Sequence, residues 1–213
     1  MAREARRIRI RGARLSDVAP ILACLRDAFA PYRRRYTAVA FSATVLDARR
    51  LARRLRVQHV LVATDTHSRI LGTVSVRLSA ASHARLRGMA VPRERQGTGV
   101  ANRLLRAALR FAHRRGCHRV TLETTPPLRR AMRFYERQGF RRTGRYRNWG
   151  GMRLIEYAAS LPEAAALADV PRRRDVRRKK LGRRTGRRGS TPASSMSPRP
   201  GRPTPSGPVK ARS

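Results

Sequence analysis

The feature that most limits how this chain can fold is a glycine-rich loop between a strand and a helix near the middle of the sequence. The stretch covers residues 89–105, MAVPRERQGTGVANRLL. Glycine permits close approach of a ligand because it has no Cβ, and the first amides of a helix have no partner within the helix. A strand that ends near Val91, followed by a helix that begins near Gly99, therefore predicts a cradle of backbone N–H groups for a phosphate-containing ligand.

Two better-known phosphate-binding loops do not match this stretch. No Gly-Lys-Ser/Thr ending follows the glycines, so a P-loop ATPase is unsupported. Gly97 and Gly99 lack the third glycine of the dinucleotide-binding motif, and the loop lies in mid-chain rather than at the start of the fold. A Gly-x-Gly turn alone also fits an ordinary helix start, so the surrounding pattern has to decide.

The apolar pattern on both sides of the loop predicts strands and helices that alternate around a mixed sheet. In the helix after the loop, for example, Val100, Leu104, Ala108 and Phe111 recur on one face. The expected strands are 7–11, 59–64, 70–78, 85–91, 119–124 and 152–157. The expected helices begin near Ser16, cover 43–55 and 99–115, and follow the Pro126-Pro127 pair.

Two motifs in this order resemble the GCN5-related N-acetyltransferase (GNAT) family. The loop is similar to that family's acetyl-CoA motif, Q/R-x-x-G-x-G/A, with Gln96, Gly99 and Ala101 at the fixed positions. Residues 122–140, LETTPPLRRAMRFYERQGF, resemble the family's closing strand–helix segment, which ends in Tyr-Glu-x-x-Gly-Phe. The resemblance extends over about residues 7–158.

The resemblance implies an α/β GNAT fold with a mixed, mostly antiparallel central sheet flanked by helices. Its fourth and fifth strands would splay apart to admit the pantetheine arm of acetyl-CoA, the implied co-substrate, and no metal is expected. Arg93 and Arg95 would either screen the outer phosphates or lie in solvent. The residues implied to bind acetyl-CoA are Met89, Val91, Gln96, Gly97, Thr98, Gly99, Val100 and Ala101.

The same resemblance supplies candidates for the two proton movements of direct transfer to an amine. Tyr135 would donate a proton to the leaving thiolate, although a tyrosine on an apolar stripe is also an ordinary core residue. Glu123 would be the base, as in relatives that acetylate ribosomal-protein N-termini. The alternatives are His83, a chain of water molecules, or a structural pairing of Glu123 with arginine. Arg85 stands where many relatives carry a carboxylate. Leu128 stands where many have an asparagine, so the contacts of coenzyme A with residue 128 would be apolar.

The composition changes near residue 171. Residues 171–213 are rich in Arg, Pro, Ser and Gly and have too few apolar groups to bury a core, so we expect a disordered tail. They carry +14 of the total net charge of +39, and residues 1–170, the expected acetyltransferase domain, carry the other +25. This charge predicts attraction to polyanions, including non-specific nucleic-acid binding through the tail. A coding bias without functional meaning is the alternative.

The predicted function is transfer of acetyl from acetyl-CoA to a primary amine, on a small molecule or a protein N-terminus, by a monomer or homodimer. Residues 28–55 would line the acceptor cleft, and the scarcity of acidic residues argues against polycationic acceptors. The alternatives are a nucleic-acid-binding protein that uses the basic tail and a non-catalytic acetyl-CoA-binding regulator. Cys24 and Cys117 are expected to be reduced core thiols. Without a signal sequence or long apolar run, we expect a cytoplasmic protein with no membrane contact.

Overall fold

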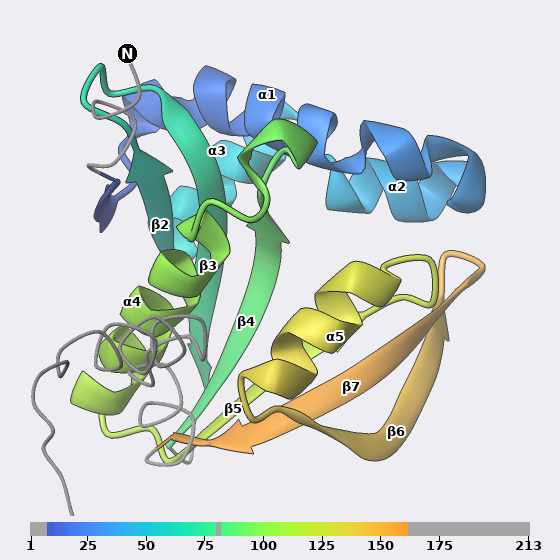
Figure 1. The fold of residues 1–213 in the computed structure, drawn as a ribbon. Coiled ribbons are helices and arrows are strands. Elements are labelled where there is room, and N and C mark those ends of the chain that lie inside the picture. The colour runs from blue at the N-terminus through green and yellow to red at the C-terminus, as the bar shows by residue number, and fades with distance from the viewer. Residues whose placement is uncertain (1–7, 80–81, 162–213) are drawn as a thin grey trace, which may run out of the picture. The chain divides into compact units, whose positions relative to one another are not determined.

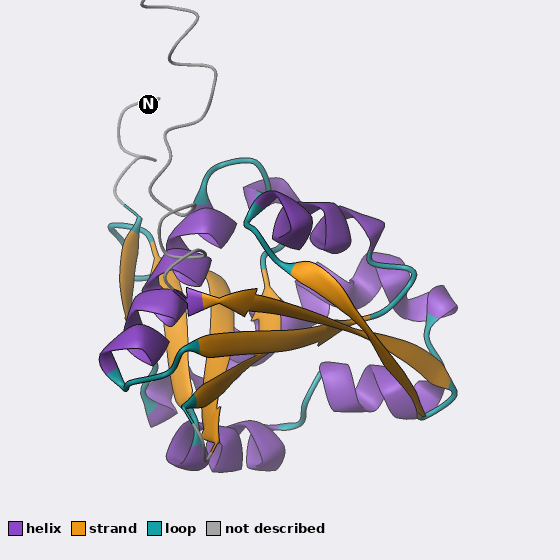
Figure 2. Cartoon of the chain, turned by 90° about the horizontal axis from the view of Figure 1, so that it is seen from below, coloured by secondary structure: helices purple, strands orange, loops and turns teal. Residues whose placement is uncertain are grey.

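The computed structural model of the chain describes residues 8–79 and 82–161, which form a seven-stranded sheet with helices on both faces (Figure 1, Figure 2). The expected tail, residues 171–213, lies outside the described residues. The strands are β1 (Arg9–Gly12), β2 (His59–Thr64), β3 (Ile70–Ser79), β4 (His83–Ala90), β5 (Arg119–Thr124), β6 (Arg141–Trp149) and β7 (Met152–Ser160). The α-helices are α1 (Val18–Phe29), α2 (Ala38–Thr44), α3 (Ala48–Val57), α4 (Val100–Arg114) and α5 (Arg129–Arg137). Three 3-10 turns are η2 (Leu15–Asp17), η3 (Ala30–Arg35) and η4 (Arg93–Arg95).

The strand order is β1-β2-β3-β4-β5-β7-β6, and every neighbouring pair is antiparallel except β4 with β5. The parallel pairing is short, since it joins residues 83–86 of β4 to residues 119–122 of β5. β4 continues to Ala90 and β5 to Thr124 without further pairing to each other. The two strands therefore start together and then diverge (Figure 1), as the mixed, splayed sheet of the sequence analysis requires.

Each face of the sheet carries its own apolar core. Successive residues of a strand point to opposite faces, and β2 follows this rule. Leu61 and Ala63 pack with α4 and α5 in one buried cluster. Val60 and Val62 pack with α1 and α3 in the other. The predicted core role of the cysteines is confirmed, because Cys24 and Cys117 are buried and unpaired.

Gly72 of β3 brings α4 unusually close to the sheet. A Cβ at this position would lie 2.9 Å from Val100 Cγ1 and 3.0 Å from both Leu104 Cδ1 and the Ala90 carbonyl oxygen. Those distances are shorter than ordinary van der Waals contact and one of them is to backbone, so a side chain here would push α4 away from the sheet. The contact seats the first turn of α4 beside the end of β4, which places the glycine-rich loop between them.

Two sequence predictions need correction. The helix expected over 43–55 is two helices, because α2 ends at Thr44 and Asp47 caps a new helix, α3, where its carboxylate accepts the Arg50 N–H at 2.7 Å. β6 was not predicted at all. Nearly all of its residues are exposed, so it has no buried face to produce an alternating pattern, and pairing with β7 defines it instead. In the described part of the chain, no helix combines the length and apolarity needed to cross a bilayer.

Candidate active site

The glycine-rich loop carries free backbone donors in open space. Gly97 and Gly99 adopt φ values of +85° and +93°, and nothing lies within 4 Å of the place a Cβ would occupy at either. Among the described residues, no hydrogen bond uses the backbone N–H groups of residues 97–101. Gly99 is the N-cap of α4 and offers no side-chain cap. Unpaired donors, the positive end of a helix and open space coincide here, which fits a diphosphate.

The polar side chains of the loop brace it. The Gln96 amide donates to the Val91 carbonyl at 3.0 Å, and the Thr98 hydroxyl donates to the Arg95 carbonyl at 2.6 Å. Both hydrogen bonds lie within the loop, and neither uses the backbone N–H groups of residues 97–101. In this structure the Gln96 side chain therefore holds the shape of the cradle, and the Val91 carbonyl already has one partner.

A pocket of about 280 Å³ opens where β4 and β5 diverge. Gly88 and Met89 of β4 line it on one side, and Glu123 and Thr124 of β5 line it on the other. Helical groups from both faces of the sheet complete its walls, among them Tyr135 of α5. The pocket thus reaches both faces through the gap in strand pairing.

Tyr135 lies in the wall of this pocket and is buried. Its hydroxyl donates to Met89 Sδ at 3.4 Å, and its ring packs edge-on against Phe134 and Phe140. Burial raises the pKa of the phenol well above its usual range, so the hydroxyl stays protonated at neutral pH. The Tyr135 hydroxyl therefore lies beside the Met89 sulfur, where β4 and β5 diverge.

Among the described residues, Glu123 is the one carboxylate that lines the pocket, and arginines donate hydrogen bonds to both of its oxygens. Oε1 accepts from Arg147 at 2.9 Å and from Arg85 at 3.1 Å, and Oε2 accepts from Arg147 at 3.1 Å. Burial opposes ionisation, but the Arg147 hydrogen bond and the nearby positive charges outweigh it and hold the Glu123 pKa below its usual value. The carboxylate is therefore ionised at neutral pH, and the structural pairing weighed in the sequence analysis is present.

His83, the other side chain considered as a base, does not line the pocket. It opens β4 six residues before Met89, which is about 20 Å away along an extended strand. Its Nε2 lies 3.0 Å from the Thr121 hydroxyl. Burial and the charges of Arg119 and Arg85 lower its pKa.

The sequence pattern of the acetyltransferase (GNAT) family matches residues 23–140, more than half of the chain. The matched segment contains the glycine-rich loop, both diverging strands and Tyr135. The chain belongs to the GNAT family.

Solved GNAT structures share this fold. A GNAT-family acetyltransferase of Staphylococcus aureus Mu50 superposes with a TM-score of 0.61 at 16% identity, over 73% of this chain and 99% of that chain. The PaiA N-acetyltransferase of Thermoplasma acidophilum, solved in complex with coenzyme A, gives 0.61 at 17% identity, over 70% and 98%. The ribosomal-protein-S18-alanine N-acetyltransferase of Escherichia coli gives 0.60 at 17% identity, over 73% and 94%. At these identities the likeness shows the fold alone.

A curated relative is similar over a shorter stretch. N-alpha-acetyltransferase 30 of Schizosaccharomyces pombe is 36% identical over 83 residues, which cover 37% of this chain and 55% of the relative. This chain therefore matches only about half the length of that protein.

The wall of the pocket includes part of the segment that the sequence predicted to line an acceptor cleft. Of residues 28–55, those that line the pocket are Phe29, Tyr36, Ala40, Ala43, Thr44 and Arg54. Phe41 does not line it and packs edge-on against Tyr36 instead, with ring centroids 6.4 Å apart. Leu128 lies in the pocket wall, which fits the apolar contact expected at that position.

The sequence pattern did not predict that the β6–β7 hairpin closes one side of the pocket. Trp149 at the end of β6 lines the pocket, and the Thr37 hydroxyl donates to the Gly150 carbonyl in the hairpin turn. The Tyr36 and Thr125 hydroxyls lie 2.5 Å apart and tie the same helical segment to the end of β5. No local sequence pattern predicts these contacts, because they join residues about 90 to 110 positions apart along the chain.

Proposed function

We propose that this protein transfers the acetyl group of acetyl-CoA directly to a primary amine, on a small molecule or a protein N-terminus. The observation that carries the proposal is the pocket between β4 and β5. It places the Tyr135 hydroxyl and the Glu123 carboxylate around one space, and GNAT membership supports acyl transfer there.

Acetyl-CoA is proposed to bind along the diverging strands. The N–H groups of residues 97–101 are the proposed donors to its pyrophosphate, with Gln96 holding the loop in shape. The free edge of β4 near Met89 and Val91 is the proposed partner of the pantetheine arm, since β5 leaves that edge unpaired. The thioester supplies the activated acetyl group.

The proposed reaction needs two proton transfers. The neutral amine nitrogen forms a bond to the thioester carbonyl carbon, and the carbon–sulfur bond breaks. Tyr135 donates its proton to the departing sulfur, a role that its protonated, buried hydroxyl suits. Glu123, as the carboxylate in the pocket wall, takes the proton that the ammonium form of the acceptor must lose before it attacks, and the second nitrogen proton leaves to solvent as the amide forms.

Direct attack is favoured over an acetyl-cysteine intermediate. Neither Cys24 nor Cys117 lines the pocket. Burial, with the nearby charges of Asp27 and Glu94, raises the pKa of the Cys24 thiol to about 12, so this cysteine carries almost no thiolate at neutral pH.

The proposal is tested by following acetyl-CoA consumption and acetylated amine together across a pH series. We expect one acetylated amine for each thiol released. We also expect Glu123→Gln to lower kcat/KM at pH 7 by about 10²-fold, because general base catalysis contributes roughly 10²–10⁴-fold. Because the Glu123 pKa lies below its usual value, the wild-type carboxylate stays ionised at and above neutral pH. The rise of the wild-type rate with pH therefore reports deprotonation of the acceptor amine. The deficit of the variant should therefore shrink as pH rises and the amine deprotonates by itself.

Glu156→Gln is the matched control, because Glu156 also faces Arg85, at 3.8 Å, but does not line the pocket. A Glu123→Gln deficit that stays constant with pH would make Glu123 a structural partner of Arg147. Thiol release without any acetylated amine would contradict the proposed function.

A further inference from the structure

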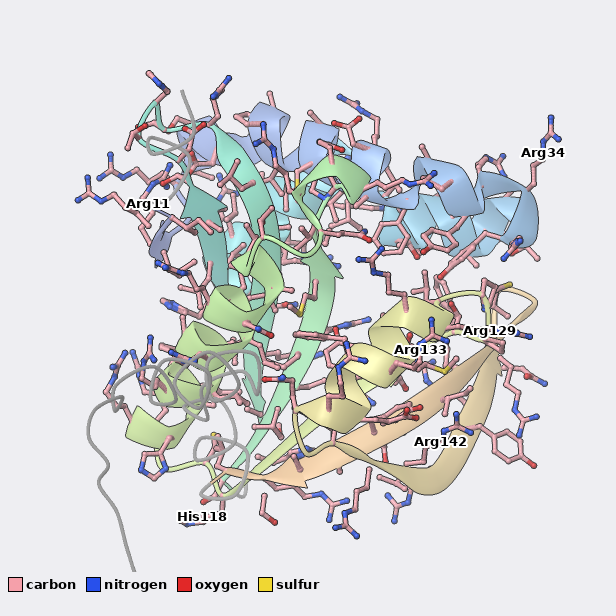
Figure 3. The ribbon with its side chains drawn as sticks, in the orientation of Figure 1. Arg11, Arg34, His118, Arg129, Arg133 and Arg142 are labelled. Atoms are coloured by element: carbon pink, nitrogen blue, oxygen red, sulfur yellow. The ribbon has the colours of Figure 1, made fainter. Side chains whose placement is uncertain are left out.

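The pocket carries an excess of positive charge that the acetyl-transfer chemistry does not use. Arg54, Arg85, Arg87 and Arg147 line it, against the single carboxylate of Glu123. Arginines extend from many elements of this basic protein, as Arg34 of η3 and Arg129 of α5 illustrate (Figure 3). The four pocket arginines differ from these in lining one common space, although Arg87 and Arg147 are also exposed to solvent.

The four pocket arginines fall into two classes. Arg85 and Arg147 both form hydrogen bonds to Glu123. Within residues 8–79 and 82–161, no carboxylate forms an ion pair with Arg54 or Arg87. We call Arg54 and Arg87 the arginine pair.

The arginine pair occupies one side of the gap between the strands. Arg54 lies in the pocket wall beside Gly88, whose missing Cβ would stand only 2.6 Å from Arg54 Nη1. Arg87 is next to that glycine on β4 and points to the face opposite Leu86, which is buried under α4 and α5. Both guanidinium groups therefore approach the divergence point from the α3 side of the sheet, across from Tyr135.

Two like charges in this position are costly without an anion between them. Burial and the charge of Arg87 lower the pKa of Arg54 to about 10, and burial followed by the charge of Arg85 lowers that of Arg87, which the Glu123 carboxylate offsets only in part. Both groups remain charged at neutral pH. An anion bound between them would relieve the repulsion and satisfy the forked donors of each guanidinium.

The phosphates of coenzyme A do not explain the pair. No residue of the loop 92–101 lines the pocket, so the proposed pyrophosphate site is a separate place. The pair also lies on the sheet face opposite α4, the helix whose first turn forms that site.

We propose that the acceptor is an amine that carries a carboxylate, and that Arg54 and Arg87 bind this carboxylate while the amine faces the thioester. This inference rests on the proposed acetyl transfer and specifies its substrate class. A free amino acid and a peptide N-terminus followed by an acidic side chain both present this chemistry.

The experiment compares matched acceptors that differ only in the carboxylate. One arm uses free α-amino acids and their carboxamides, and the other uses short peptides that begin Ser-Asp or Ser-Asn. We expect kcat/KM to favour the carboxylate member on the order of 10- to 100-fold in one arm, since hydrogen bonds to charged groups are worth about 1.5–3 kcal/mol. The arm that shows the preference identifies the source.

The variants Arg54→Gln and Arg87→Gln should each bring the ratio of kcat/KM for the carboxylate acceptor to that for its carboxamide close to unity. Arg53→Gln is the control, because Arg53 is an exposed residue on the same helix and does not line the pocket. Calorimetric binding of the N-acetylated product, in its carboxylate and carboxamide forms, should show the same change without turnover. Melting temperatures show whether each variant is folded. If replacement of the half-buried Arg54 prevents folding, the exposed Arg87 still provides a test through Arg87→Gln.

The outcomes separate this inference from the function on which it rests. Wild-type acetylation without a carboxylate preference in either arm would overturn the inference and leave the acetyltransferase intact. A preference that survives both substitutions would overturn the assignment to the arginine pair. Failure to acetylate any amine in either arm would overturn the proposed function and the inference together.

Discussion

Replacing Tyr135 with phenylalanine should lower the single-turnover rate of acetyl transfer by about 10²–10⁴-fold, because the variant loses the proposed general acid. Affinity for acetyl-CoA should change little, since the proton moves only when the carbon–sulfur bond breaks. The ring contacts with Phe134 and Phe140 remain in the variant, and the lost bond to Met89 Sδ is long and weak. Single-turnover mixing is the appropriate measurement, because product release can mask a change in the chemical step.

Tyr157→Phe is the matched control for this result. Tyr157 is also a buried tyrosine whose hydroxyl is hydrogen-bonded, to Glu136 and Arg142, but it does not line the pocket. Its replacement should leave the single-turnover rate within about threefold of wild type. An equal, small effect of both substitutions would make Tyr135 a packing residue and nothing more.

Replacing Gly99 with valine should weaken acetyl-CoA binding on the order of tenfold to a hundredfold, the worth of about one charge-assisted hydrogen bond. The site a Cβ would occupy at Gly99 is open, and the neighbouring amides are the proposed pyrophosphate donors. The added side chain would fill the space that the phosphate needs. Isothermal calorimetry with acetyl-CoA measures the change directly.

Backbone strain has to be separated from this steric effect, because Gly99 has φ +93° and a residue with a Cβ is strained there by about 1–3 kcal/mol. Gly116→Val provides the comparison. Gly116 follows the other end of α4, has φ +73°, and also has open space at the Cβ position. We expect both variants to lose stability but only Gly99→Val to lose affinity. Unchanged affinity in a folded Gly99→Val protein would place the phosphate site elsewhere.

The sequence predicted the parts of the fold that depend on local patterns. β2 and β5 match their predicted bounds, and α4 was predicted to within a residue at each end. These elements have one buried face and clear ends, which a single sequence displays. β6 was missed because its exposed, arginine-rich residues carry no such pattern.

The candidate site was predictable where one segment supplies it. The loop 96–101 and the Tyr135 helix are contiguous motifs, so their spacing along the chain carries the information. The arginine pair was not predictable, since Arg54 and Arg87 are two among 51 basic residues. Only the divergence of β4 from β5 and the missing Cβ of Gly88 distinguish them from surface arginines.

The position of Glu123 was predictable from the sequence, but its pKa was not. Its position on β5 was predicted, but the ion pairs that lower its pKa come from β4 and β6. Arg147 belongs to the strand that the sequence pattern did not show. The low pKa of the Glu123 carboxylate is therefore a property of the assembled sheet.

The central claim is that acetyl-CoA binds in the gap between β4 and β5, with its thioester beside Tyr135. A crystal structure of the protein with acetyl-CoA bound tests this most directly. We expect the pyrophosphate on the N–H groups of residues 97–101, the pantetheine arm along β4 near Met89, and the sulfur within hydrogen-bonding distance of the Tyr135 hydroxyl. Acetyl-CoA bound away from this gap, or with its sulfur remote from Tyr135, would contradict the account.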